Sequence, residues 1–173
     1  MRNEHFSSLT SHGRTLFQIV AAPGKFFEDR RQHPYLFSSG AFLIISALLF
    51  TAASLVFQRP PSLLITGAIL LGNALGMVMI LSFISYLVMV LSIGKKASFR
   101  QIFSIFAYAS GTSLMAAWIP HLLIVSEPWR WCLIGIGLTR GCGLKWMGSI
   151  WIMVCSITVT TLLLQSILLM VHA

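Results

Sequence analysis

Charged residues are scarce in this chain of 173 residues, and they lie in short clusters between long apolar stretches. There are 12 Lys and Arg and 4 Asp and Glu, so charged residues make up 9% of the sequence, against about 25% in soluble domains. The stretch 61–93 carries no charge, although about 20 apolar residues suffice to cross a bilayer as a helix. The chain is therefore predicted to be an integral membrane protein.

The apolar stretches and the residues that break them predict an all-α, polytopic helical membrane bundle with five transmembrane helices. Ser98 and Gln101 form the S-x-x-Q pattern of a capping box at the start of the third helix, and Pro120 is expected to interrupt it. The fourth stretch is short, carries Arg130 near its start, and would equally fit a re-entrant segment. The predicted spans are about 36–57, 61–93, 98–119, 128–139 and 147–171.

The Lys and Arg residues predict the orientation of these helices. With the N-terminus in the cytoplasm, ten of the 12 lie on the cytoplasmic side, and only Arg59 and Arg130 lie outside. If the fourth stretch failed to cross, the split would be eight to four. The positive-inside rule therefore favours five spans, with the N-terminus inside and the C-terminus outside.

The segment that precedes the membrane domain has two predicted parts. Residues 1–13 are polar and are expected to be flexible, with no cleaved signal peptide. Residues 14–33 alternate apolar and charged side chains, which is typical of an amphipathic segment in the membrane interface, and Pro23-Gly24 is expected to divide this segment into two short pieces. A protein-binding surface is the alternative. The side chains expected at the acyl boundary and the lipid headgroups are Lys25, Phe26, Phe27, Arg30 and Arg31.

No pattern in the sequence indicates catalysis. Glu127 and the other three acids are expected in termini or loops, whereas proton-coupled carriers place an ionisable residue within the membrane. The histidines do not pair, the three cysteines lack CxxC spacing, and no nucleophile elbow or phosphate loop occurs. We therefore expect a protein that is not an enzyme and holds neither a cofactor nor a metal ion. The net charge of +8 suits lipid headgroups better than nucleic acid.

Two helix faces carry small or polar residues at regular spacing. In the second span, small residues every four positions would let another helix approach closely, either within the chain, which we favour, or in a homodimer. The residues of this stripe are Ala68, Gly72, Asn73 and Gly76. In the last span, Thr158, Thr161 and Gln165 share one face. They would bond to other helices or, alternatively, line a polar path.

Several short motifs follow one another through most of the chain. They are Val20-x-x-Pro23-x-x-Phe26-Phe27, a Gly-Lys-Lys loop, Ser98-Phe99-Arg100-Gln101 leading to Tyr108, then Trp131, Ile136-Gly137-Leu138 and Gly143-Leu144. In their order and spacing they resemble the Yip-domain (Ypt-interacting protein) family, in a short prokaryotic form. The resemblance covers about residues 16–164.

That resemblance implies a five-span membrane domain with a cytoplasmic N-terminus. Eukaryotic members associate with small GTPases in vesicle traffic. Here Tyr108 is followed by Ala109 instead of the family's usual proline, and the last cytoplasmic loop lacks the family's acid and histidine. GTPase binding is therefore not carried over to this chain.

The sequence as a whole predicts a non-enzymatic membrane protein that acts as a scaffold, an assembly partner or a membrane-organising module. One alternative is a small-solute facilitator or channel, formed by an oligomer around the polar face of the last span. Another is an accessory subunit of a larger membrane complex. The expected partners are the lipid bilayer and other membrane proteins or further copies of the chain, not nucleic acid. The expected location is the bacterial cytoplasmic (inner) membrane.

Overall fold

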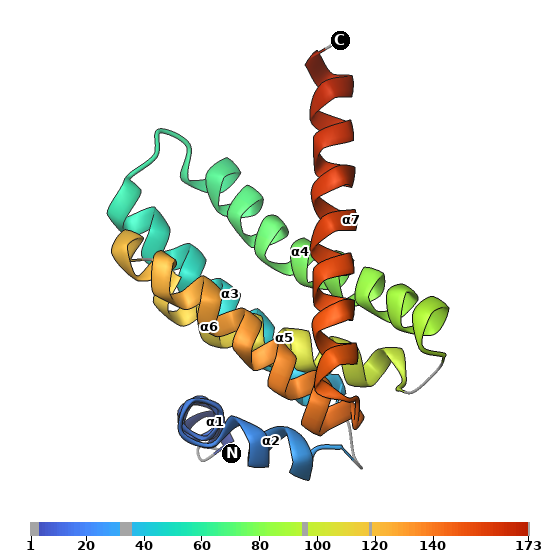
Figure 1. Ribbon diagram of the computed structural model, residues 1–173. Coiled ribbons are helices and arrows are strands. Elements are labelled where there is room, and N and C mark those ends of the chain that lie inside the picture. Colours follow the sequence, from blue (N-terminus) through green and yellow to red (C-terminus); the bar gives the residue numbers. More distant parts are fainter. Residues whose placement is uncertain (1–3, 32–35, 95–96, 118, 173) are drawn as a thin grey trace.

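The computed structural model describes residues 4–31, 36–94, 97–117 and 119–172, and this part of the chain is helical without strands. The predicted all-helical class is confirmed. The helices are α1 (Glu4–Ala21), α2 (Pro23–Asp29), α3 (Leu36–Gln58), α4 (Leu63–Ser92), α5 (Phe99–Ala117), α6 (Pro120–Ile136), the π-helix η1 (Gly137–Gly141) and α7 (Trp146–His172). In Figure 1, α5 lies beside α3 and α6, α7 stands upright against α4, and α1 and α2 lie beneath the bundle.

Three helices are long and apolar enough to cross a membrane by length and composition. They are α3, α4 and the Trp146–Leu163 part of α7. α6 has only 17 residues, fewer than the roughly 20 that a span needs, and α5 contains Arg100 and a polar middle. The chain is thus a helical membrane protein with several apolar helices.

α5 is the central helix of the bundle, and every residue from Ser104 to Ser113 is buried. Its polar groups find partners inside the protein. The Thr112 hydroxyl donates to the Tyr108 carbonyl at 2.8 Å, and the Ser113 hydroxyl donates to the Ser126 carbonyl at 3.3 Å. A helix that protein surrounds needs no apolar outer surface, which explains why so polar a sequence lies at the centre.

The fourth helix begins earlier than the sequence indicated. It was expected at about 128–139, but α6 begins at Pro120 and η1 continues it to Gly141. Proline is favourable in the first turn of a helix, where its missing N–H has no helical partner, so Pro120 opens this helix. The continuous stretch is 17 residues of α-helix followed by 5 residues of π-helix, with Pro128 inside it.

The N-terminal segment is also helical over more residues than expected. α1 begins at Glu4, so most of the stretch predicted to be flexible lies in a helix. The predicted break at Pro23 is present, because Ala22 leaves the helical region and Pro23 opens α2. The His12 ring stacks on Phe42 of α3 with centroids 4.4 Å apart, and burial lowers the pKa of His12 below its ordinary value, which favours the neutral ring.

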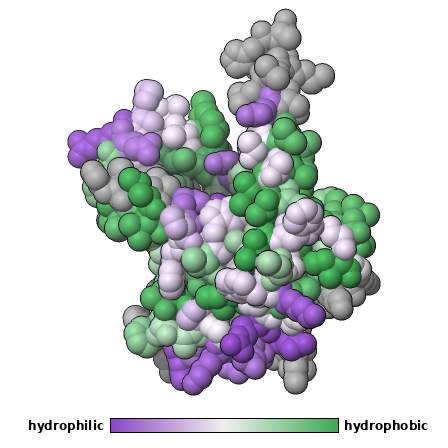
Figure 2. Space-filling view, viewed as in Figure 1, coloured by the Kyte–Doolittle hydropathy of each residue, from purple (hydrophilic) through white to green (hydrophobic). Residues whose placement is uncertain are grey.

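α7 is held to α4 by a buried pair of serines. The Ser85 hydroxyl donates to the Ser156 hydroxyl at 2.9 Å, and Ser156 donates to the Ile152 carbonyl of its own helix at 2.6 Å. Much of the rest of α7 is exposed, including Met147 and Leu162. In Figure 2, apolar residues cover large parts of the face, while hydrophilic residues gather at the lower end, over α2. This distribution suits a protein whose flanks contact lipid.

Gly111 provides a test of how tightly α3 packs on α5. A Cβ atom there would lie 2.7 Å from Phe42 Cε1 and 3.2 Å from Ser46 Oγ, and Phe42 is itself buried. Gly111→Ala should therefore lower the free energy of unfolding by about 1–3 kcal/mol through overpacking, measured as a lower Tm in detergent.

Gly76→Ala is the matched control for Gly111→Ala. A Cβ at Gly76 meets nothing within 4 Å among the described residues, and alanine is the better helix former by up to about 1 kcal/mol. Its Tm should stay equal or rise. Equal Tm values for the two variants would contradict the close contact between α3 and α5.

Candidate functional site at one end of the bundle

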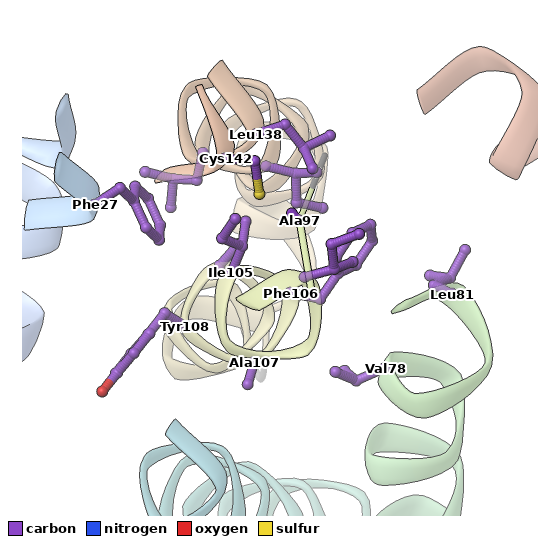
Figure 3. Packing of buried hydrophobic residues seen from close by; sticks show 14 of the residues in the cluster. Phe27, Val78, Leu81, Ala97, Ile105, Phe106, Ala107, Tyr108, Leu138 and Cys142 are labelled. Carbon is purple, nitrogen blue, oxygen red and sulfur yellow. The ribbon is translucent and has the colours of Figure 1, made fainter. Parts of the chain in front are cut away.

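Motif residues from distant parts of the sequence meet where α2 packs on α5 and η1. We call this place the α2–α5 junction, formed by Phe26, Phe27, Arg30, Gln101, Ile105, Tyr108, Leu138 and Cys142. Figure 3 shows Ile105 extending from α5 toward Cys142 and Leu138, with Phe27 entering from α2. All three aromatic side chains of the junction are almost fully buried. The junction therefore fixes the N-terminal helices to the bundle.

Arg30 is held between two aromatic rings of the junction. Its guanidinium carbon lies 4.1 Å from the Phe26 ring centroid and 4.6 Å from the Tyr108 centroid. The two rings meet edge to face at 5.0 Å. Cation–π contacts contribute about 0.5–2 kcal/mol, more where water is excluded. Arg30 Nη1 is buried without a hydrogen-bond partner among the described residues. The two aromatic rings therefore offset much of the cost of burying the guanidinium charge.

Gln101 connects three elements at the same place. Its Nε2 donates to the Arg31 carbonyl at 2.9 Å and to the Gly141 carbonyl at 3.3 Å. Its backbone N–H donates to Ser98 Oγ, and the Ser98 N–H donates to Gln101 Oε1. The predicted capping box is confirmed. The same side chain also ties the end of α2 and the end of η1 to the start of α5, which local sequence spacing cannot reveal.

The glycines of η1 allow it to lie directly on α5. A Cβ at Gly137 would collide with Ile105 Cγ2, and one at Gly141 would lie 3.3 Å from Ile105 Cδ1. π-helical turns are rare and often occur at functional sites. Just after η1, burial raises the pKa of the Cys142 thiol to about 12, although the nearby Arg31 charge opposes the shift. Cys142 is therefore a packed thiol and a poor nucleophile at neutral pH.

The sequence placed side chains of α2 at the membrane interface, and the structure differs from this expectation for the aromatic pair. Phe26 and Phe27 do not enter the lipid: they are 6% and 3% exposed and pack inside the protein. The sequence suggested otherwise because an aromatic pair on a short amphipathic helix looks the same whether it faces lipid or protein. Lys25 and Arg31 are exposed, and Arg30 is half-buried. The exposed apolar side chains of this region are Phe17 and Val20 on α1.

The small-residue stripe on α4 has open space at its two glycines. Ala68, Gly72 and Asn73 are exposed, and a Cβ at Gly72 or Gly76 would meet nothing within 4 Å in the described part of the chain. No helix packs directly on these two glycines in the described part of the chain, so packing within the chain and packing between copies both stay predictions. Asn73, beside the glycines, lines a cavity between α4 and the other helices.

The polar face of the last span does not line a cavity of the described residues. Thr158, Thr161 and Gln165 are exposed on α7, and the Thr158 hydroxyl donates to the Val154 carbonyl of its own helix at 2.9 Å. The polar residues that face α4 are Ser156 and its neighbour Thr160, one turn apart. Polar residues at helical spacing in the sequence do not show which face of the helix packs against a neighbouring helix.

Sequence reasoning missed a largely apolar cavity between α4 and the rest of the bundle, into which an ion pair is placed. Glu127 was expected in a loop, but it lies inside α6 and pairs with Arg130, Oε2 to Nη2 at 2.8 Å. Both line a cavity of about 370 Å³ together with Asn73 and Ser110. The early start of α6 at Pro120 is the reason, because it moves Glu127 from the predicted loop into the helix that carries Arg130.

Among the described residues, no group of three His, Cys, Asp or Glu is placed to hold a metal ion. The fold and the junction thus define a multi-helix membrane protein whose N-terminal helices are fixed to a buried central helix.

Comparison with protein families specifies this class further: the Yip1 domain model matches residues 17–168, and the chain belongs to the Yip1 domain family. This family is associated with membrane trafficking and is not known for enzymatic activity. Comparisons with curated proteins and with solved structures give no match.

Tyr108 provides the test of the α2–α5 junction. Tyr108→Leu removes one ring from Arg30 and the edge-to-face partner of Phe26, with an expected loss of about 1–2 kcal/mol. α2 should then open about 5–30 times more often, measured as faster trypsin cleavage at Lys25 and Arg31.

Tyr108→Phe keeps the ring and removes only the hydroxyl, which lies 3.1 Å from Ser38 Oγ. This variant should be cleaved much more slowly than Tyr108→Leu. Cleavage of Tyr108→Leu at the wild-type rate would show that the ring stack does not hold α2.

Proposed function

We propose that the protein is a five-span, non-enzymatic scaffold that organises other membrane proteins or further copies of itself. The observation that carries the proposal is the fixed attachment of α1 and α2 to the bundle through the α2–α5 junction. A segment attached in this way presents a defined surface. On it, Phe17 is 73% and Val20 53% exposed, beside the exposed Lys25.

This surface combines apolar and basic side chains, which suits either headgroups or a protein partner. We expect Lys25, Arg30 and Arg31 to contact anionic headgroups, with Arg30 contributing least because the rings of Phe26 and Tyr108 cover it. The stripe of Ala68, Gly72 and Gly76 offers a second contact, to another copy of the chain, while Asn73 beside it lines the cavity. The facilitator alternative lacks such support, since Thr158 and Thr161 are exposed on one side of α7.

Five crossings follow if α5 and α6 cross with the other three helices. α5 is enclosed by protein from Ser104 to Ser113, so its polarity is no obstacle. α6 and η1 together are long enough. We further propose that the N-terminus is cytoplasmic and the C-terminus outside, in the bacterial cytoplasmic membrane. In support, α1 and the end of α7 lie at opposite ends of the molecule (Figure 1).

Reporter fusions test this orientation. A reporter fused after Ala173 should be active only outside the cytoplasm, and one inserted in the α4–α5 connection only inside it, because most Lys and Arg would then lie inside. A third reporter in the α6–α7 connection should be cytoplasmic. A cytoplasmic Ala173 reporter would mean that α6 does not cross and would contradict the five-span proposal.

Photo-crosslinking tests the scaffold role. A crosslinking amino acid at Phe17 should capture a discrete protein adduct in native membranes, because this side chain points away from the protein. The matched control is Ile19, two residues away on α1 and fully buried, which should give only intramolecular products. Adducts with lipid alone at Phe17 would show that α1 is a membrane anchor and would contradict the scaffold surface.

A further inference from the structure

The cavity between α4 and the other helices has an uneven lining. Most of it is apolar, as at Met77 and Leu114, but the Glu127–Arg130 ion pair forms one strongly polar part, and Asn73 adds a neutral polar side chain from α4. Its volume of about 370 Å³ is within the usual range for ligand sites, about 300–1,000 Å³. α4 forms one wall, and α3, α5 and α6 form the other. A ligand suited to this lining has one strongly polar part and one apolar part.

The ion pair leaves hydrogen-bonding capacity on both of its partners. Glu127 and Arg130 side chains are 41% and 22% exposed, and one contact of 2.8 Å joins them. A guanidinium has five N–H donors, and Arg130 Nε is buried without a hydrogen-bond partner among the described residues. Where water is scarce, an unmatched donor of a charged group is costly. Both a positive and a negative group therefore face the same cavity with unused bonding positions.

We propose that this cavity binds a membrane phospholipid whose headgroup carries a phosphate and a primary ammonium, as phosphatidylethanolamine does. The phosphate accepts hydrogen bonds from Arg130 and the ammonium donates to Glu127, while Asn73 contacts the ester region. The acyl chains lie along the apolar lining at Met77 and Leu114. This inference is independent of the scaffold role.

The charges select this headgroup among common phospholipids. A purely anionic headgroup, as in phosphatidylglycerol, would satisfy Arg130 but meet the like charge of Glu127. A choline group is cationic but has no N–H to donate to the Glu127 carboxylate. Phosphoethanolamine matches both charges with charge-assisted hydrogen bonds, which are the stronger kind.

The experiment measures the Tm of the full-length protein in detergent with added lipid. Phosphatidylethanolamine should raise the Tm in a concentration-dependent manner, as a ligand of the folded state does. Phosphatidylcholine and phosphatidylglycerol of the same acyl chains should raise it less. Glu127→Gln and Arg130→Gln should each weaken the response to phosphatidylethanolamine about tenfold or more in lipid concentration.

A cavity-filling variant keeps the proposal testable if the charge variants fold poorly. Ala74→Phe fills the cavity from α4 and leaves both charges in place, and it should abolish the response. Ile80→Phe is the control, since Ile80 is 48% exposed on the same helix, does not line the cavity and lies outside the small-residue stripe. It should respond as the wild type does.

Three results would overturn the proposal. The first is an equal Tm response to all three lipids, and the second is a wild-type response in Ala74→Phe. The third is an equal response to water-soluble glycerophosphoethanolamine, which would show recognition of a soluble headgroup without the membrane lipid.

Discussion

The burial of α5 on all sides is the constraint on which the rest of this structure depends. A helix with serine, threonine and glycine in its middle would be costly against lipid tails, which offer no hydrogen bonds. α3, α4 and α6 therefore surround it, and Gly111 lets the Phe42 ring approach. The other features attach to the same helix: α2 through Tyr108 and η1 through Ile105. The centre of the bundle is thus a helix that is less apolar than α3, α4 and α7.

The two polar sites lie on successive halves of α5. The α2–α5 junction uses Gln101 and Tyr108 in its first half, and the cavity uses Ser110 and Leu114 in its second. The two sites differ in how their charged and polar groups are stabilised. At the junction, aromatic faces and carbonyl groups compensate Arg30 and Gln101, leaving little free volume. In the cavity, Arg130 has a carboxylate partner and open space beside it. The α2–α5 junction thus serves to attach the N-terminal helices rigidly, and the cavity serves the proposed ligand binding.

Local patterns in the sequence predicted local structure well and tertiary partners poorly. The helical class, the break at Pro23 and the capping box of Ser98 and Gln101 depend on neighbouring residues, and they are confirmed. Whether Phe26 faces lipid or protein depends on Tyr108, which is far away in the sequence. In the same way, the Gly72 stripe indicates a flat helix face but not what covers it. The resemblance to the Yip-domain family is confirmed by the family match over residues 17–168, and several of its motif residues meet at the junction.

The position of Arg130 also strengthens the argument for the orientation. Counted at the outer end of the fourth predicted span, Arg130 was one of two basic charges on the outer side. Since it lies in α6 and pairs with Glu127, it no longer acts as a free loop charge, and Arg59 alone stands against ten Lys and Arg on the proposed cytoplasmic side. The pair is close to neutral as a unit, so its transfer into the bilayer costs less than that of two separate charges. If α6 crosses, the same pairing that lowers the cost of its charges leaves them facing the cavity, where a zwitterionic headgroup can match them.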